Sequence, residues 1–224
     1  MSSEPIQINP IECAAALNKL KRKVPYGWDL NVYRGCQHGC KYCYAIYSHK
    51  YMEDDNFFGS ISVKTNVVEA LERELRKPSW KREIVNLGGV TDNYQPLEAE
   101  YQLMPEILKL LIKYKTPAII STKSDLPLRD LELIDRLSRI TYINVAATIT
   151  TTDEAVRKKL EPGGSEWQKR VEMLRVVRKE TNASVVVHLM PIVPFLTDTD
   201  ENLETICRIS KEVNAHYLLP GALY

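Results

Sequence analysis

An α/β fold built on a parallel sheet is predicted by three features of the sequence. From about residue 61 onward, segments with apolar residues at helical spacing alternate with short extended segments. The extended segments are continuously apolar, which is typical of strands buried on both faces beneath helices. The connections between them are short, as strand–helix–strand units require. Two architectures fit this pattern, a doubly wound open sheet and a complete or partial barrel, and periodicity does not choose between them.

Six strands are expected along the chain. The second, IVNLGGV, is short and apolar and ends in two glycines, and the fifth, SVVVHLMPIV, is the most strand-like run of the sequence. In order, the predicted strands cover residues 30–33, 84–90, 118–122, 142–150, 184–193 and 216–223.

Five helices are expected between these strands. Each has apolar residues three or four positions apart with charged residues between them, as Val67, Leu71 and Leu75 do in the first helix. The predicted helices cover about residues 67–75, 101–112, 131–137, 165–180 and 203–213. Both candidate architectures bind ligands at the carboxyl ends of their strands, so the segments that directly follow each strand are where function is expected.

One domain is expected over residues 1–224, with an amino-terminal segment, 1–29, before a β/α core, 30–224, that stops directly after the sixth strand. The 44% of hydrophobic residues can fill a large core, and the net charge of +1 argues against disorder and against a uniformly basic surface. No apolar run approaches the roughly 20 residues of a membrane helix, and the polar amino end does not resemble a signal peptide. A cytoplasmic protein without membrane contact is therefore expected.

The most informative segment is RGCQHGCKYCYA, residues 34–45, directly after the first predicted strand. It places Cys36, Cys40 and Cys43 in a C-x3-C-x2-C arrangement. Three thiolates can hold an iron–sulfur cluster whose fourth iron stays open, because such a cluster usually takes four ligands. The alternative is a zinc site completed by His38, His49 or a distant cysteine. Zinc sites usually pair their ligands as two short doublets, so the spacing favours the open cluster.

This cysteine loop resembles the signature of the radical S-adenosylmethionine (radical SAM) superfamily, including the aromatic Tyr42 before the last cysteine. The longer string NVYRGCQHGCKYCYA is similar to the spore photoproduct lyase-like branch of that superfamily. The likeness extends over nearly the whole chain, through VTDNYQPLE, ISTKSD, TITTTD, EPGGSEWQKR and MPIVPFLTD.

The resemblance implies a partial (β/α)6 TIM-type barrel of parallel strands. It also implies a [4Fe–4S] cluster on Cys36, Cys40 and Cys43 whose open iron chelates SAM. One electron would cleave SAM reductively into methionine and a 5′-deoxyadenosyl radical, which abstracts hydrogen from a substrate. A low-potential donor, ferredoxin or flavodoxin, is the expected partner.

The resemblance also implies which residues surround SAM. Glycines at the end of the second strand would let the backbone approach the SAM amino group, a lysine after the third would meet its carboxylate, and a threonine ending the fourth would meet its ribose. Each also has an ordinary structural explanation: a tight strand exit, a solvated charge and strand packing. The expected cofactor-binding residues are Tyr42, Gly88, Gly89, Thr91, Lys123 and Thr148.

Several residues outside this set carry weaker signals. Glu161 and Arg170 are expected to form an ion pair unless Arg170 reaches the cofactor, and His188 is expected in the core. The basic string KLKRK, residues 19–23, is interpreted as a solvated arm, with nucleic-acid contact as the alternative. Tyrosines crowd around the cysteine loop and could stack on a base or shield a cluster.

The substrate is left open by the sequence. The spore photoproduct lyase branch carries a hydrogen-donating cysteine beside the end of the second strand, whereas this chain has Gly-Gly-Val-Thr-Asp there. Photoproduct reversal is therefore not predicted, and nucleic acid remains one candidate substrate. A zinc-stabilised nucleic-acid-binding module without catalysis is the alternative to the enzyme. A cluster that serves only electron transfer is a third hypothesis.

Overall fold

A seven-stranded sheet forms the centre of the molecule in the computed structural model, which describes residues 6–223 except 22, 23, 25 and 52–55. Its strands follow the order β10-β9-β8-β7-β6-β3-β2. Their bounds are β2 Leu17–Lys19, β3 Trp28–Leu30, β6 Val85–Leu87, β7 Ala118–Thr122, β8 Ile143–Thr148, β9 Ser184–Ile192 and β10 Tyr217–Ala222.

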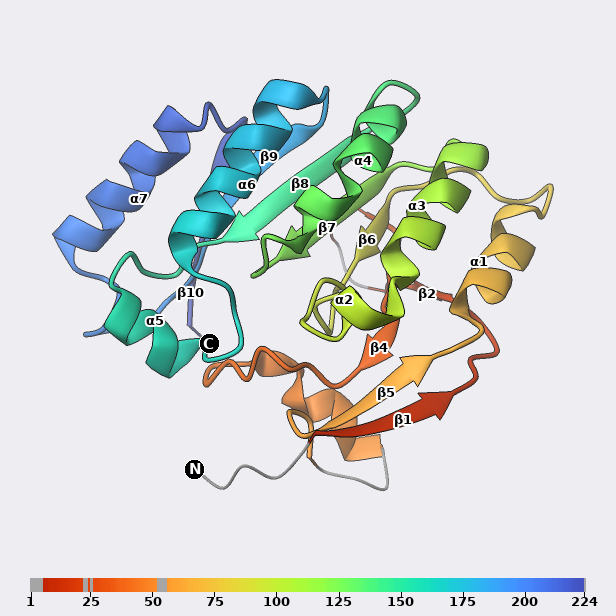
Figure 1. Ribbon diagram of the computed structural model, residues 1–224, viewed down its shortest axis with the longest axis horizontal. Coiled ribbons are helices and arrows are strands. Elements are labelled where there is room, and N and C mark those ends of the chain that lie inside the picture. Colours follow the sequence, from red (N-terminus) through yellow and green to blue (C-terminus); the bar gives the residue numbers. More distant parts are fainter. Residues whose placement is uncertain (1–5, 22–23, 25, 52–55, 224) are drawn as a thin grey trace.

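The order of these strands decides between the two predicted architectures. From β3 to β10, spatial neighbours are successive strands of the sheet and every pair is parallel, while β2 pairs antiparallel with β3 at one edge. A doubly wound sheet reverses its strand order at a switch point, which this sheet does not do. The helices lie along one face of the sheet (Figure 1). The fold is therefore a partial (β/α)6 barrel of TIM type, as the resemblance implied.

The helices lie close to their predicted positions. Their bounds are α1 Val67–Leu75, α2 Glu98–Tyr101, α3 Leu103–Lys113, α4 Leu131–Ser138, α5 Glu154–Leu160, α6 Trp167–Glu180 and α7 Asp200–Glu212, with 3-10 helices η1 Tyr44–Tyr51 and η2 Leu126–Asp130. The helix predicted over 101–112 is divided, because Gln102 adopts a left-handed backbone conformation (φ 49°) between α2 and α3. Helix α5 and both 3-10 helices were not predicted. No helix in the described part of the chain is long and apolar enough to cross a membrane.

The first predicted strand, 30–33, is wrong in detail. The barrel strand β3 ends at Leu30, and the chain then leaves the sheet. The backbone of Val32 bonds elsewhere, since its amide donates to Asn93 Oδ1 (3.1 Å) and its carbonyl accepts from the amide of Lys64 (3.1 Å). Tyr33 consequently begins β4, a strand of another sheet. The sequence of residues 30–33 did not indicate that the chain passes from one sheet to another there.

That second sheet has the order β1-β5-β4 and was not predicted. Strands β1 (Gln7–Ile11) and β5 (Ser60–Lys64) are parallel, and β4 (Tyr33–Arg34) is antiparallel to β5. In Figure 1 it lies below the carboxyl ends of the barrel strands. Strands β1 and β2, which lie in the predicted amino-terminal segment 1–29, pair with β5 and β3.

The barrel strands present alternate residues to opposite faces, which separates core from lumen. On β8, Val145 and Ala147 belong to the apolar core beneath the helices. The alternate residues Asn144, Ala146 and Thr148 therefore face the lumen, and His188 on β9 pairs in register with Thr148. Asn144, Thr148 and His188 thus contribute polar side chains to the lumen.

Candidate cofactor site around the cysteine loop

The cysteine loop crosses the carboxyl-terminal mouth of the barrel. It begins with a tight backbone contact, because Gly35 has φ +81° and a Cβ there would lie 2.5 Å from the carbonyl oxygen of Ser60. The amide of Cys36 then donates to the Phe57 carbonyl (3.0 Å). Cys36 and Cys40 are each 7% exposed and Cys43 is half-buried. The loop is therefore held by its backbone, with its thiols turned away from bulk water.

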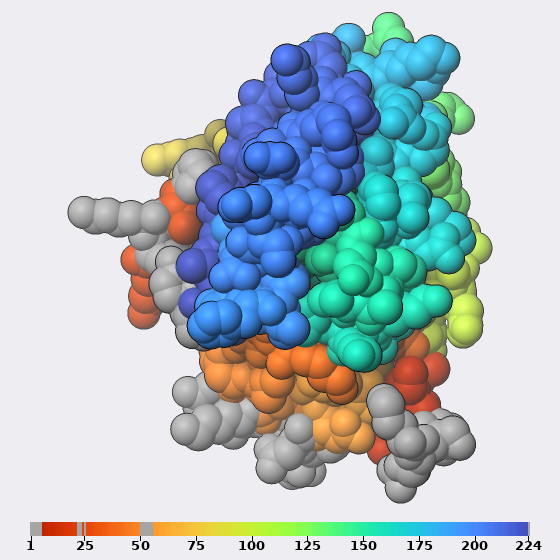
Figure 2. Space-filling view, turned by 90° about the vertical axis from the view of Figure 1, so that its left-hand side faces the viewer, coloured from red at the N-terminus to blue at the C-terminus, as the bar shows by residue number. Residues whose placement is uncertain are grey.

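The segment after α5 holds the loop from the other side. The amide of Lys41 donates to the Leu160 carbonyl (2.8 Å), and the amide of Gly163 donates to the His38 carbonyl (2.9 Å). A Cβ at Gly163 would lie 2.1 Å from the carbonyl oxygen of Gln37, so only glycine fits this approach. Figure 2 shows the region of the loop directly beneath α5 at the lower edge of the molecule. The glycines of EPGGSEWQKR thus serve to clamp the cysteine loop.

A second anchor joins the loop to the strand ends. His38 Nε2 lies 2.9 Å from Asp92 Oδ2, and its Nδ1 lies 3.0 Å from the Gly163 carbonyl oxygen. Asp92 Oδ2 also accepts from the Thr122 hydroxyl (3.0 Å) and the Lys123 amide (2.8 Å). Burial alone would raise the pKa of Asp92, but the hydrogen bonds from His38 and the nearby amides hold that pKa below its usual value. Both ring nitrogens of His38 are occupied, so His38 does not complete a zinc site.

Glu161 and Arg170 form the predicted ion pair, and it is buried rather than superficial. Arg170 Nη1 lies 2.6 Å from Glu161 Oε2, with the two side chains 0% and 1% exposed. Glu161 Oε1 accepts from the Thr150 hydroxyl (2.9 Å) and from the Tyr42 hydroxyl. Burial would raise the pKa of Glu161, but Arg170 and Lys123 outweigh it and lower that pKa. Through Tyr42, the ion pair fixes the side chain between the second and third cysteines of the loop.

Lys123, the predicted carboxylate partner, directly follows β7 and lies beside Tyr42 of the cysteine loop. Its ammonium is 5.6 Å from the centroid of the Tyr42 ring and has no hydrogen-bond partner among the described residues. Burial alone would lower the pKa of Lys123, but Tyr42, Cys40 and Glu161 raise it, so the side chain is a cation. An unpaired ammonium beside the cysteine loop is suited to an anionic group of a bound molecule.

The glycine pair closes β6 against the barrel lumen. Gly88 has φ +95°, and a Cβ at Gly89 would lie 2.6 Å from the Asp29 carboxylate. The amides of Val90 and Thr91 donate to Asn31 Oδ1 (2.9 and 3.2 Å). The Tyr44 hydroxyl donates to the Gly89 carbonyl. The backbone at 88–91 is therefore fixed, and no side chain fits at Gly88 or Gly89 without displacing a neighbour.

The two threonines at the end of the fourth barrel strand have different surroundings. The Thr150 hydroxyl is bonded within the Glu161 cluster, whereas Thr148 accepts from Arg170 only through its backbone carbonyl (2.9 Å). Both are buried. Thr148, on the lumen face, is the one whose hydroxyl has no hydrogen-bond partner in the described part of the chain. Cys13 and Cys207 lie outside this site, and Cys207 is exposed.

The donor set fits a cluster better than a single ion. The three thiols belong to one short loop, in which Cys40 contributes to the raised pKa of Cys36 and Cys43 contributes to the raised pKa of Cys40. Burial is the larger cause and raises the pKa of Cys36 to about 12, so a soft metal centre would have to displace the proton. Within the described residues, no group of three His, Cys, Asp or Glu side chains is arranged to hold one metal ion. Ligands of a four-iron cube bind different irons and stand farther apart, so nothing supports the zinc hypothesis.

Several supporting residues were missed by sequence reasoning. Asn31 holds the backbone at residues 90–91, and Asp92 joins the strand ends to His38 of the cysteine loop, yet each is a single polar residue beside a strand. A second buried cluster carries the segment 94–98, where the Glu98 carboxylate meets the Tyr33 hydroxyl (2.5 Å) and Arg129 (2.8 Å). The string VTDNYQPLE is unusually rich in polar residues for a segment that follows a buried strand. The structure shows that most of these polar side chains are buried, and only the fold shows what they contact.

Comparison with known proteins agrees with this geometry. A family model described as the radical SAM superfamily matches residues 30–207. The chain belongs to the radical SAM superfamily. An uncharacterized protein of Mycobacterium tuberculosis is 37% identical over 208 residues, covering 90% of this chain and 60% of its own length. An uncharacterized protein of Methanocaldococcus jannaschii is 31% identical over 196 residues, covering 87% of this chain and 71% of its own. The chain thus spans about 60% of the mycobacterial relative.

Solved structures of radical SAM proteins share the fold at low sequence identity. A spore photoproduct lyase complexed with dinucleoside spore photoproduct superimposes with a TM-score of 0.66 at 13% identity, covering 91% of this chain and 58% of that one. A methylornithine synthase gives a TM-score of 0.55 at 13% identity, covering 98% and 54%. Enzymes of the radical SAM superfamily cleave SAM at an iron–sulfur cluster with an electron from a reductant, and this activity belongs to the proposal for the chain below. The substrate is not implied.

Proposed function

We propose that this protein is a radical SAM enzyme that holds a [4Fe–4S] cluster on Cys36, Cys40 and Cys43. The observation that carries the proposal is the set of three buried or half-buried thiols on one clamped loop at the mouth of a radical SAM barrel. When bound, the cluster and SAM supply a 5′-deoxyadenosyl radical that takes a hydrogen atom from the substrate. A ferredoxin or flavodoxin would supply the electron, and the thiolate ligands favour the reducing cytoplasm.

The chain's own residues would bind and orient SAM. The ammonium of Lys123 is unpaired among the described residues and suits the SAM carboxylate. The backbone at Gly88 and Gly89 can be approached closely, because no side chain projects from it. Thr91 lies beside these glycines, and Thr148 offers a hydroxyl from the lumen face. We propose these five residues and Tyr42 as the cofactor-binding set.

Anchoring of Tyr42 is the second contribution of the protein. The Tyr42 hydroxyl is bonded to Glu161, whose charge is balanced by buried Arg170. This places a ring beneath the Lys123 ammonium and covers the inner side of the loop. A dry and rigid surrounding limits side reactions of a radical and keeps the reacting groups oriented.

Photoproduct reversal is not the expected reaction, because this chain has no cysteine at the end of β6 to donate a hydrogen atom. The end of β6 presents Gly88, Gly89, Val90, Thr91 and Asp92, with no thiol other than those of the loop. Spore photoproduct lyase has been solved in complex with a dinucleoside spore photoproduct. For this chain we propose only hydrogen abstraction, with the substrate class argued in the next subsection.

The proposal is tested by SAM cleavage in a matched pair of variants. The anaerobically reconstituted protein, reduced with dithionite, should convert SAM to 5′-deoxyadenosine and methionine. Cys40→Ala removes a cluster ligand, so its rate of SAM cleavage should fall by roughly 100-fold or more. It should also bind much less iron than the wild type. Cys207→Ala, which removes an exposed thiol from α7, should retain both. Cleavage by Cys40→Ala at the wild-type rate would refute the assignment.

A further inference from the structure

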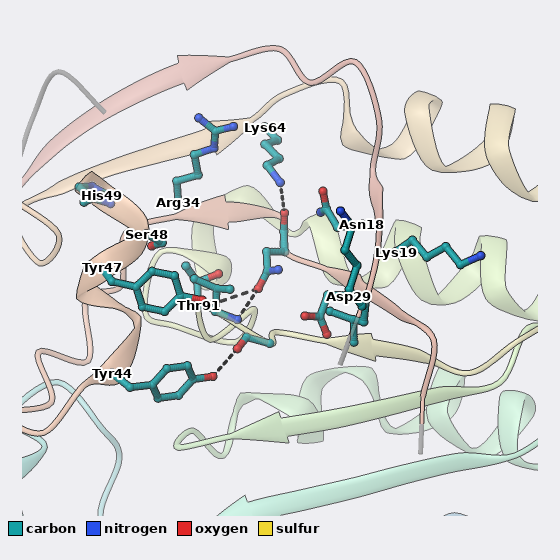
Figure 3. A pocket seen from close by; sticks show the side chains of 15 residues that line it. Asn18, Lys19, Asp29, Arg34, Tyr44, Tyr47, Ser48, His49, Lys64 and Thr91 are labelled. Carbon is teal, nitrogen blue, oxygen red and sulfur yellow. Dashed lines mark hydrogen bonds between the residues drawn. The ribbon is translucent and has the colours of Figure 1, made fainter. Parts of the chain in front are cut away.

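A cavity of about 700 Å³ opens beside the proposed SAM site. Its walls come from the segment 44–49 of η1, from β2 and β3, from β4 and β5, and from the strand end at 89–91 (Figure 3). None of the three cysteines lines it. Its volume lies within the range of ligand sites for small molecules, roughly 300–1,000 Å³. The cavity is therefore large enough for a substrate and adjoins the place where the radical would form.

Positive charge dominates the walls of this cavity. Four cationic side chains line it, and Asp29 is the one lining carboxylate among the described residues. The cations are Lys19, Lys21, Arg34 and Lys64. The Asp29 carboxylate accepts from Asn86 Nδ2 (2.9 Å) and lies against Gly89, at the side of the cavity toward the barrel lumen. A chain with a net charge of only +1 has thus gathered cations at one hollow.

Lys64 is the unusual member of this group. Its side chain is 6% exposed, and its ammonium donates to the carbonyl oxygen of Asn31 at 2.6 Å. No carboxylate of the described residues forms an ion pair with it. Burial first, and then the nearby Arg34, lower the pKa of Lys64. A buried ammonium without an acidic partner is unfavourable in the empty protein, and an anion in the cavity would relieve that cost.

Asn31 connects this cation to the proposed SAM site. Its carbonyl oxygen accepts from Lys64, while its side-chain Oδ1 accepts from the amides of Val90 and Thr91. In Figure 3 these bonds run across the cavity wall from Lys64 to the strand end. An anionic group held at Lys64 would therefore leave the rest of its molecule beside residues 89–91.

Tyrosines form the wall from the cysteine-loop side. Tyr44 and Tyr47 are 66% and 59% exposed, and Tyr44 is fixed by its bond to the Gly89 carbonyl. Exposed aromatic rings next to cations are the combination that binds a flat ring attached to a phosphate, because the ring stacks and the phosphate pairs. The wall of the cavity combines both kinds of contact.

We propose that this cavity is the substrate site of the enzyme and that it binds a phosphate ester, with the phosphate on Lys64 and Arg34 and the organic part against Tyr44 and Tyr47. The place of the cavity in the reaction rests on the proposed function, whereas phosphate binding does not. The phosphate comes from either a free nucleotide or a nucleic-acid strand, and both share this chemistry.

Binding assays on the reconstituted protein with SAM test the proposal. The probes are thymidine 5′-monophosphate, a short oligodeoxythymidylate and phosphate-free thymidine, measured by calorimetry and by fluorescence anisotropy. Lys64→Met and, separately, Arg34→Gln should each weaken binding of the phosphorylated probes roughly 10- to 100-fold, as expected for a lost charge-assisted hydrogen bond. Lys113→Met, which removes an exposed lysine paired with Glu72 on the outer helices, should bind as the wild type does. Two variants are used so that one misfolded protein does not decide the test.

The outcomes separate the two proposals. If the oligonucleotide binds more tightly than the monophosphate and its affinity falls steeply with salt, the natural ligand is a nucleic-acid strand. If the monophosphate binds as tightly as the oligonucleotide, the natural ligand is a free nucleotide. Either result supports the site when binding requires Lys64 and Arg34. Thymidine binding as tightly as its monophosphate, no binding of any probe, or wild-type affinity in both variants would overturn it. SAM cleavage by the wild type is assayed separately: phosphate binding without any cleavage would refute the proposed function and leave the phosphate site standing.

Discussion

The buried ion pair between Glu161 and Arg170 makes a quantitative prediction about stability. The two side chains are 1% and 0% exposed, and their closest atoms are 2.6 Å apart. Arg170→Met keeps most of the side-chain volume but leaves the Glu161 carboxylate buried without its cation. Removing one partner of a buried pair usually destabilises a protein by about 3–5 kcal/mol. For a chain of this size, that corresponds to a melting temperature lower by roughly 6–20 °C.

The matched control lies on the same helix. Arg175 pairs with Glu172 at the surface, with side chains 50% and 55% exposed, so Arg175→Met should leave the unfolding free energy nearly unchanged. The double variant Glu161→Gln/Arg170→Met removes both charges while its amide oxygen can still accept from Tyr42 and Thr150. It should recover roughly 0.5–3 kcal/mol relative to Arg170→Met.

The assay is equilibrium urea unfolding of the cluster-free protein at pH 7, with iron content after reconstitution as a second readout. Arg170→Met should also take up less iron, since Glu161 anchors Tyr42 within the cysteine loop. The reasoning is refuted if Arg170→Met unfolds within about 1 kcal/mol of the wild type, or if the double variant is less stable than Arg170→Met.

Two further predictions concern the lumen and the glycine pair. Burial, with a contribution from Lys123, lowers the pKa of His188 to about 4, so the folded state binds fewer protons than the unfolded state between pH 6.5 and 4. This contribution to stability is complete above pH 6.5 and is lost as the pH falls. The free energy of unfolding in urea should therefore be up to about 2 kcal/mol lower at pH 5 than at pH 7.5. His188→Gln should reduce that difference, and an identical pH dependence in the variant would contradict this prediction. Gly89→Ala should destabilise by about 1–3 kcal/mol because its Cβ would lie 2.6 Å from the Asp29 carboxylate, and it should weaken SAM binding in calorimetry. Gly27→Ala, whose Cβ would meet nothing closer than 3.5 Å, is the control, and equal effects of the two would argue against a close approach at Gly89.

The sequence allowed the barrel strands and the cysteine loop to be predicted for a physical reason. A continuous apolar run such as 184–193 has apolar side chains on both faces of its strand, so both faces must be covered. Three cysteines within eight residues can converge because the loop between them is short. The six parallel barrel strands and the cluster loop were therefore predictable without knowledge of distant contacts.

The missing parts depend on long-range contacts between polar residues. Lys64 ends β5, a strand of five residues that pairs with β1, and nothing in SISVK showed that its lysine is buried at a cavity. Gly163 is required because residue 37, far away in the chain, passes within van der Waals distance. Such requirements are set by the folded arrangement, whereas periodicity reports only local burial.

The most direct test of the account is the cluster itself. Iron and sulfide are measured on the anaerobically reconstituted protein, and electron paramagnetic resonance is recorded on the reduced protein before and after addition of SAM. The account predicts about four irons and four sulfides per chain and a signal that changes when SAM is added, because the fourth iron is open to it. A protein that binds no iron, or a cluster whose signal is unchanged by SAM, would contradict it.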